Sequence, residues 1–544
     1  MALERLNIET VVLNGQIVTM DKPGHRVEAL AIAQGRIVAR GSTDEIRALA
    51  PHAAVIDCEG RTVLPGIVDS HCHPDMHGAR IGRWYDFFDG RIDTRDKLLA
   101  LVRAETKDKP HDSWFTAYRF DEMHSGGYPT LDELDAASGG RPVFIYRRDA
   151  HMGVASSAAL KAVGFHDTAS DPAFGRIERD PATGRPTGLL RARAAHIVIE
   201  HIQAAYTAED FRSGLVKVLD EYLSFGITSV HNSLTTSQAI SAYQTMRQNG
   251  ELKTRIGILA SGRDDDLVRA IVRSGMRSGF GDDWIRLIGL EWVGDGSTSG
   301  RTAAYYDPYL GEPVLGEPPD NRGSILLDRE EYTRRVAEAH AAGLMVCTDA
   351  IGDRAIDFFL DVYDDVLAAD PRPDHRMRIE HCCNVTPAIL ARLKRSGVVC
   401  SSATGFAYDL GDAYLQNRGA DAMKVMWPHR SMIDAGVPAP GHSDAPVCSA
   451  NPFFGISAMV NRQTQGGRSI DQSEAVTVHE ALEAYTRLGA WCGREEQAKG
   501  DLGLGKLADL CILDRDPFAI PPLDLANVTV LSTMVDGAIV FDRR

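Results

Sequence analysis

The sequence predicts an α/β protein built around a (β/α)8 TIM barrel, with a small β-sandwich-like domain formed by both chain ends and a long insertion after the first barrel strand. Three observations support this fold class. The 544 residues exceed the size at which a single hydrophobic core usually stops growing. Short apolar runs alternate with helical stretches through the middle of the chain, as in parallel βα units. Both ends instead carry β-rich runs broken by glycine turns.

The two chain ends share one sequence pattern, in which short aliphatic runs are separated by glycine turns. Near the start, two turn signals interrupt short apolar runs and each predicts a hairpin, at Asn14-Gly15 and at Gln34-Gly35. The tail again pairs aliphatic runs with a glycine turn. We therefore expect residues 1–60 and 501–544 to form one small β domain, with residues 61–500 as the barrel domain between its halves.

Eight strand-like runs make up the predicted barrel. They span residues 63–71, 226–232, 254–260, 285–296, 343–350, 376–383, 397–403 and 436–445. Amphipathic stretches such as 330–343 and 353–369 lie between several of them and predict outer helices. A ninth run, 142–151, falls in the long segment 75–207 after the first strand. We expect this segment to be an insertion that covers the functional end of the barrel.

Composition narrows the class of protein. The balance of 59 basic against 75 acidic residues gives a net charge of −16, which argues against general affinity for nucleic acid or anionic membranes. The start lacks the basic and apolar regions of a signal peptide, and no run reaches the roughly 18 apolar residues of a membrane span. Nine scattered cysteines without a CxxC pair fit reduced thiols. We expect a cytoplasmic protein with a small-molecule substrate. A homodimer is one possible assembly, because homodimers are common among soluble proteins.

The first barrel run ends in two histidines, His71 and His73, one residue apart. Alternate residues of a strand share a face, so both imidazoles should point the same way, with Cys72 turned opposite as a small core residue. Two neutral imidazoles at the end of a strand suit a divalent metal such as zinc. Taken alone, such a pair is as often merely exposed or hydrogen-bonded.

Further polar residues lie at the ends of later predicted strands. The fourth run carries Glu291, the fifth ends beside Asp349, the sixth contains His381 and the eighth ends beside Asp444. A single glutamate is more often an ion-pair partner, and a single histidine is more often a hydrogen-bonded core residue. Their joint occurrence at the carboxyl ends of barrel strands favours one metal site instead, because barrel enzymes hold their chemistry there.

Several motifs along nearly the whole chain resemble those of the metal-dependent amidohydrolase superfamily. The resemblance is to its amidohydrolase-3 or YtcJ-like group, which includes N-substituted formamide deformylase. It rests on the motifs PGIVDSHCH, GITSVHN, AIGDRAID, RIEHCC, GHSDAPV and LGKLADLCILDRDPF. The resemblance implies an enzyme of the metal-dependent amidohydrolase type.

The resemblance also implies roles for individual residues. His71 and His73 would ligate the more buried metal together with Asp444, which would also accept a proton from the attacking water. Glu291 stands where the group has a carbamylated lysine or a glutamate that bridges two metals. His381 would bind the second metal or hold the substrate.

Three positions depart from the group's pattern. Asp349 stands where the group usually has a histidine, Ala192 where relatives usually carry an acidic residue, and Asn232 where many have aspartate. Asp349 can still ligate a metal, but it adds negative charge to the second site and weakens the case for two ions. We take Asp444 and Asp349 as the candidate catalytic residues, with one or two divalent ions as cofactor: zinc first, with manganese, iron or cobalt as alternatives.

The expected reaction is hydrolysis of a non-peptide C–N bond in an N-substituted amide, formamide, carbamate or cyclic amide. A bound divalent ion lowers the pKa of its water and polarises a carbonyl. Asp444 would take the proton of that water and return it to the leaving amine. A lyase, decarboxylase or isomerase on the same scaffold is the alternative, which Asp349 keeps open. A non-catalytic regulatory protein is a third.

Four further residues are expected to contact the substrate. His151 matches a histidine motif of the group's insertion, and Arg301 follows the fourth-strand motif. Trp292 and Tyr118 are expected as pocket walls. Each also has an ordinary alternative: a loop histidine, an arginine that pins its own loop, and aromatic rings that pack in a core.

Overall fold

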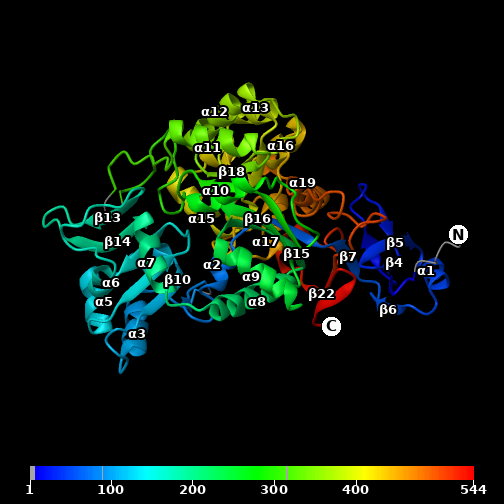
Figure 1. The fold of residues 1–544 in the computed structure, drawn as a ribbon, viewed down its shortest axis with the longest axis horizontal. Coiled ribbons are helices and arrows are strands. Elements are labelled where there is room, and N and C mark those ends of the chain that lie inside the picture. The colour runs from blue at the N-terminus through cyan, green and yellow to red at the C-terminus, as the bar shows by residue number, and fades with distance from the viewer. Residues whose placement is uncertain (1–6, 89, 314–316) are drawn as a thin grey trace.

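The computed structural model describes residues 7–88, 90–313 and 317–544, and a parallel sheet curled into a barrel forms its centre (Figure 1). Seven strands pair in chain order, each parallel to the next. They are β8 (Ile67–Cys72), β15 (Ile227–Thr235), β16 (Arg255–Ser261), β17 (Ile285–Val293), β18 (Met345–Ala350), β19 (Arg378–His381) and β20 (Val399–Ser402). This arrangement confirms a TIM-like barrel.

An irregular segment, residues 437–445, takes the place of the predicted eighth strand. On one side it accepts hydrogen bonds from β20, from Ser402 N to Pro440 O at 2.8 Å. On the other side Asp444 N donates to His71 O at 3.0 Å, so the segment also pairs with β8. Pro438 and Pro440 have no N–H and cannot continue a regular ladder. The prediction of a regular eighth strand is therefore wrong, although the segment still closes the barrel.

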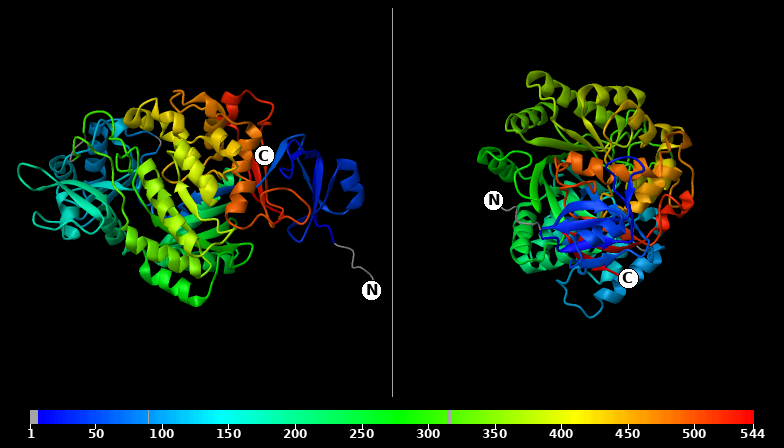
Figure 2. Two further views of the ribbon diagram at one scale, coloured as in Figure 1. Left: turned by 90° about the horizontal axis from the view of Figure 1, so that it is seen from above. Right: turned by 90° about the vertical axis from the view of Figure 1, so that its right-hand side faces the viewer.

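Amphipathic helices cover the outside of the barrel (Figure 2). The longer ones are α8 (Ala208–Ser224), α9 (Ser237–Gln248), α10 (Asp265–Ser274), α11 (Arg329–Ala341), α12 (Asp353–Ala369), α13 (Pro387–Ser396) and α17 (Pro452–Asn461). Their buried faces form one large apolar cluster with the outward side chains of the strands, and this cluster includes Phe359 and Tyr332. Within the described ranges, no helix combines the length and apolar character that a membrane crossing needs.

Both chain ends contribute to a second sheet region beside the barrel, blue and red in Figure 1. One six-stranded sheet has the order β23-β22-β21-β7-β2-β3, with β23 (Ala538–Asp542), β22 (Val530–Val535), β21 (Leu510–Leu513), β7 (Thr62–Pro65), β2 (Gln16–Val18) and β3 (Arg26–Val27). A four-stranded sheet has the order β5-β4-β1-β6, with β5 (Arg36–Gly41), β4 (Ala29–Ala33), β1 (Thr10–Leu13) and β6 (Ala54–Asp57).

The two predicted N-terminal hairpins have different outcomes. Gln34-Gly35 joins the antiparallel pair β4 and β5, as predicted. The hairpin predicted at Asn14-Gly15 is wrong, because β1 and β2 on either side of it belong to different sheets. A tight turn is compatible with both outcomes, and the sheet that each strand joins depends on partners far away in the sequence.

The long segment after β8 contains a sheet of its own, on the side of the barrel opposite the chain start (Figures 1 and 2). Its order is β13-β14-β12-β11-β10-β9, with β13 (Gly175–Arg179), β14 (Pro186–Ala192), β12 (Met152–Ala155), β11 (Val143–Arg147), β10 (Phe115–Phe120) and β9 (Tyr85–Asp86). The predicted ninth run is strand β11 of this sheet. Helices α3 (Arg95–Thr106), α5 (Leu131–Ser138), α6 (Ser157–Ala162) and α7 (Arg193–Gln203) lie in the same segment.

A close contact between two glycines holds the start of the insertion against the barrel. Helix α2 (Pro74–Gly78) follows the histidine pair and crosses α8, where a Cβ added to Gly214 would lie 1.9 Å from Gly78 O. The backbones can approach this far only because neither residue has a side chain.

We expect Gly214→Ala to destabilise the protein by about 1–3 kcal/mol, because the added methyl group must push the two helices apart. Chemical denaturation would measure the change. Ser213→Ala, on the neighbouring half-exposed position of the same helix, is the matched control and should have a much smaller effect. Equal stability of the Gly214→Ala variant and the natural chain would show that the contact relaxes at no cost.

Candidate metal centre

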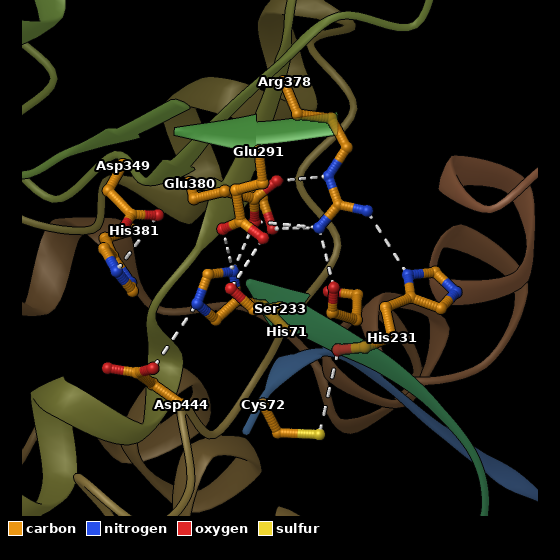
Figure 3. A network of polar contacts seen from close by, with 12 residues as sticks. His71, Cys72, His231, Ser233, Glu291, Asp349, Arg378, Glu380, His381 and Asp444 are labelled. Carbon is orange, nitrogen blue, oxygen red and sulfur yellow. Dashed lines mark hydrogen bonds and ion pairs between the residues drawn. The ribbon is translucent and has the colours of Figure 1, made fainter. Parts of the chain in front are cut away.

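A cluster of imidazoles and carboxylates lies at the carboxyl ends of the barrel strands (Figure 3). Asp444 Oδ1 lies 3.0 Å from His73 Nε2 and 3.4 Å from His71 Nε2. These three residues can place one donor atom each within 4.8 Å of one another. His71, Asp349 and His381 form a second such group, in which His381 Nε2 lies 3.7 Å from Asp349 Oδ1. The structure thus brings these five predicted residues together.

Glu291 lies between the strands that carry the two groups. Its Oε1 is 3.4 Å from His71 Nδ1. Its Oε2 accepts hydrogen bonds from Ser233 Oγ at 2.6 Å and from Leu234 N at 3.0 Å. These bonds from the end of β15 fix one carboxylate oxygen and leave the other directed at the histidines, so the structure also joins Glu291 to the cluster.

Backbone conformation directs two of these side chains. His381 has φ 63° and Asp444 has φ 58°, the left-handed region that residues other than glycine seldom adopt. Such conformations persist only where the surrounding structure imposes them, and they gather at functional sites. At His381 the change of φ ends strand β19, so strand alternation no longer decides where the imidazole points.

The donor set fits a divalent cation. Five buried polar atoms form no hydrogen bond among the described residues apart from histidine–carboxylate contacts within the cluster: His71 Nε2, Glu291 Oε1, Asp349 Oδ1, His381 Nδ1 and Asp444 Oδ1. Buried polar atoms that are not fully hydrogen-bonded are costly and rare. His73 Nδ1 lies 3.2 Å from Ser233 O, which holds the ring so that Nε2 faces Asp444. Imidazole and carboxylate donors suit zinc and similar ions.

The charges of the cluster favour a cation. Burial lowers the pKa of His71, but Glu291, Asp444 and Glu380 together raise it well above its usual range. Burial alone would raise the pKa of Asp444, yet His381, His71 and His73 hold it well below its usual range. Burial and the charge of Glu291 raise the pKa of Asp349. A proton or a metal ion would compensate the excess negative charge.

Two further residues of β19 belong to the cluster and escaped the sequence analysis. Glu380 Oε2 lies 3.0 Å from His71 Nδ1, and it accepts a hydrogen bond from Arg378 Nη2 at 2.8 Å. Both side chains are fully buried inside the barrel. Their alternate positions in the strand are the signal that indicates a shared face.

His442 was missed as well. It is fully buried, its ring centroid lies 4.8 Å from that of His71, and neither ring nitrogen has a hydrogen-bond partner among the described residues. It precedes Asp444 by two positions in the closing segment. A histidine and an aspartate with one residue between them repeat the spacing of His71 and His73, which could have identified it.

His151 and Arg301 line a cavity of about 570 Å³ between the insertion and the loop after β17. Ala192 lines it too. Arg301 Nε donates to Glu317 at 2.7 Å and its Nη1 donates to Leu310 O at 2.6 Å, so the guanidinium holds its own loop.

Trp292 and Tyr118 are not brought to the metal cluster. Trp292 follows Glu291 on β17, and its ring packs 5.7 Å from that of Tyr332 in the outer core. Tyr118 is buried in the insertion and donates to Asp86 at 3.2 Å. Both positions match the core packing that was the alternative for aromatic residues.

We expect Glu380→Gln to destabilise the protein by about 3–5 kcal/mol, because it leaves the buried guanidinium of Arg378 without its counter-ion. Urea unfolding of the metal-depleted chain would measure this without a contribution from metal binding. Glu338→Gln removes one of two exposed partners of Arg334 and should change the unfolding midpoint little. Similar midpoints for both variants would contradict the importance of the Arg378–Glu380 pair.

Comparisons with known proteins agree with this architecture. The model of the amidohydrolase family matches residues 54–541. The chain is 27% identical to N-substituted formamide deformylase of Arthrobacter pascens, over 98% of each chain. It is 26% identical to the putative amidohydrolase YtcJ of Bacillus subtilis strain 168, over 97% of this chain and 98% of that one. An uncharacterized metal-dependent hydrolase from Pyrococcus horikoshii OT3 shares the fold, with a TM-score of 0.74 and 24% identity over 94% of this chain and 99% of that one. The chain therefore belongs to the amidohydrolase family and is an enzyme of the metal-dependent amidohydrolase type.

Proposed function

We propose that this enzyme hydrolyses a non-peptide C–N bond in an N-substituted amide, formamide, carbamate or cyclic amide. The observation that carries the proposal is the convergence of His71, His73 and Asp444 with buried donor atoms that lack other partners. The similarity to N-substituted formamide deformylase supports the bond type.

We assign the first ion to His71, His73 and Asp444, with zinc as the first choice. Asp349 and His381 are the candidates for a second ion, and Glu291 lies where it could serve both. When bound, a divalent ion supplies Lewis acidity, which lowers the pKa of water and polarises the scissile carbonyl.

Asp444 is the proposed general base and acid. Its carboxylate lies beside His71 and His73, where it can accept a proton from the attacking water. The same carboxyl group would then return the proton to the leaving amine. The cavity lined by His151 and Arg301 is the proposed place for the substrate's substituent.

A lyase, decarboxylase or isomerase reaction is the second candidate, and Asp349 is the observation that favours it. Burial and the charge of Glu291 raise the pKa of Asp349, which disfavours the ionised form that a metal needs. With one ion, the metal could orient a substrate without activating water.

The number of bound ions tests the role of Asp349. We expect two equivalents of zinc per chain in the natural protein if Asp349 is a ligand, measured by plasma mass spectrometry after purification without chelator. One equivalent in the natural protein that rises to two in Asp349→His would show that the natural protein does not bind the second ion. Asp353→Asn, at the start of α12, is a control outside the cluster.

We expect Asp444→Asn to lower turnover by about 10²–10⁴-fold, because the asparagine side chain cannot take a proton from the water or give one to the leaving amine. Metal content is measured in parallel, so that loss of the ion is separated from loss of the base. Asp434→Asn, an exposed residue of α16 (His429–Ala435), should keep full activity. In ¹⁸O-labelled water, hydrolysis places solvent oxygen in the product, and a product without label would favour the second candidate.

A further inference from the structure

A network of buried polar side chains runs through the interior of the barrel and ends at His71, a candidate metal ligand. This interior network contains, in order, Lys499, Glu495, His231, Arg378, Glu380 and His71. None of these residues is more than 5% exposed. Lys499 lies beside Ser229 near the start of β15, whereas His71 lies near the end of β8, so the network extends along the strands.

Lys499 and Glu495 form the end of the interior network opposite His71. Lys499 Nζ is 2.9 Å from Glu495 Oε2, and it donates to Ser229 Oγ at 2.8 Å. The same oxygen of Glu495 is 3.6 Å from His231 Nε2. A Cβ on Gly493 would lie 2.7 Å from that ring nitrogen, so the glycine leaves the space that the imidazole occupies.

His231 and Arg378 form the centre of the network (Figure 3). Arg378 Nη1 is 3.3 Å from His231 Nδ1. A guanidinium only donates hydrogen bonds, so His231 Nδ1 must be the acceptor. Burial lowers the pKa of His231, so the ring is neutral and carries its single proton on Nε2, the nitrogen that faces Glu495.

Arg378 directs another edge of its guanidinium at Glu380. Its Nη2 donates to Glu380 Oε2 at 2.8 Å and its Nε is 2.5 Å from Oε1, so the two groups are paired through two contacts. Glu380 Oε2 is also 3.0 Å from His71 Nδ1. An imidazole that donates from Nδ1 presents the lone pair of Nε2 to an ion. The network thus determines which nitrogen of His71 is available as a ligand atom.

The interior network can act on His71 only through orientation. Its two cations, Lys499 and Arg378, balance the two carboxylates of Glu495 and Glu380, so its histidines can stay neutral. Arg378 keeps its protons at every working pH, so no proton can pass along the network. What the network can transmit is the position of a hydrogen-bonding group.

We propose that His231 is a positioning residue for the metal centre. Glu495 orients its imidazole, which accepts a hydrogen bond from Arg378 and fixes the plane of the guanidinium. Glu380, paired with that guanidinium, then holds His71 in the tautomer that binds an ion. The proposal rests on the proposed function, since it takes His71 as a ligand of the first ion.

Zinc affinity and the spectrum of bound cobalt test this role. The zinc dissociation constant is measured by competition with a chelator, and the visible absorption of the Co²⁺-loaded protein reports the geometry at the ion. We expect His231→Phe to weaken zinc binding by about 10–100-fold and to shift the cobalt absorption. His231→Gln can still accept from Arg378 through its amide oxygen, so it should retain more of the affinity. Thr533→Val removes a buried hydrogen bond from β22 to Leu223 O at 2.7 Å, and as the control it should change neither readout.

Zinc affinity and a cobalt spectrum that stay unchanged in a folded His231→Phe variant would overturn the inference. An equal loss of zinc affinity in Thr533→Val would overturn it too, because the loss would then follow from stability alone. Circular dichroism checks that each variant is folded. If His231→Phe is not, Glu495→Gln takes its place with the same expected direction, because it removes the charge that orients the ring. A natural enzyme that binds neither ion would instead refute the proposed metal site, and the role of His231 with it.

Discussion

The buried ion pair between Arg378 and Glu380 inside the barrel is the interaction on which the metal centre depends. A barrel of this size is normally filled by aliphatic side chains. Here a guanidinium and a carboxylate occupy part of the interior, and Glu380 reaches His71. Burial of both charges is expensive, and it is tolerated because each satisfies the other at close range. The result is a first histidine whose Nδ1 side is fixed before any ion binds.

From this point the site is arranged by elements that are distant in the chain. The end of β15 holds one oxygen of Glu291. His381 is placed by its own left-handed backbone conformation at the end of β19, and Asp444 is placed by the closing segment. Each of these groups has a buried polar atom whose only close contacts, if any, are within the cluster. Preorganisation of this kind lowers the cost of binding an ion, since the ligands do not have to be assembled first.

The barrel and many residues of the metal cluster could be predicted from the sequence, for physical reasons that differ between residues. Apolar runs that end in polar residues mark parallel strands, so His71 and Glu291 could be assigned to barrel strands and Asp444 to the segment that closes the barrel. The missing eighth strand could have been expected from Pro438 and Pro440, which lack N–H groups. The separation of β1 and β2 could not, because strand partners are decided by tertiary packing.

Other features depend on contacts that no local pattern encodes. Trp292 was expected in the pocket, but its neighbour Glu291 takes the inward face of the strand, so the ring packs outside. The position of a residue along a strand can thus be predicted from the sequence more readily than the side chains that it contacts in the fold.

The irregular closure of the barrel has a consequence for its integrity. Residues 437–445 join the last strand to the first through a few backbone hydrogen bonds rather than a full ladder. His71 and His73 stand on one side of this seam and Asp444 stands on the other. An ion held by all three would connect β8 to the closing segment, so that binding of the ion would also stabilise the closed barrel.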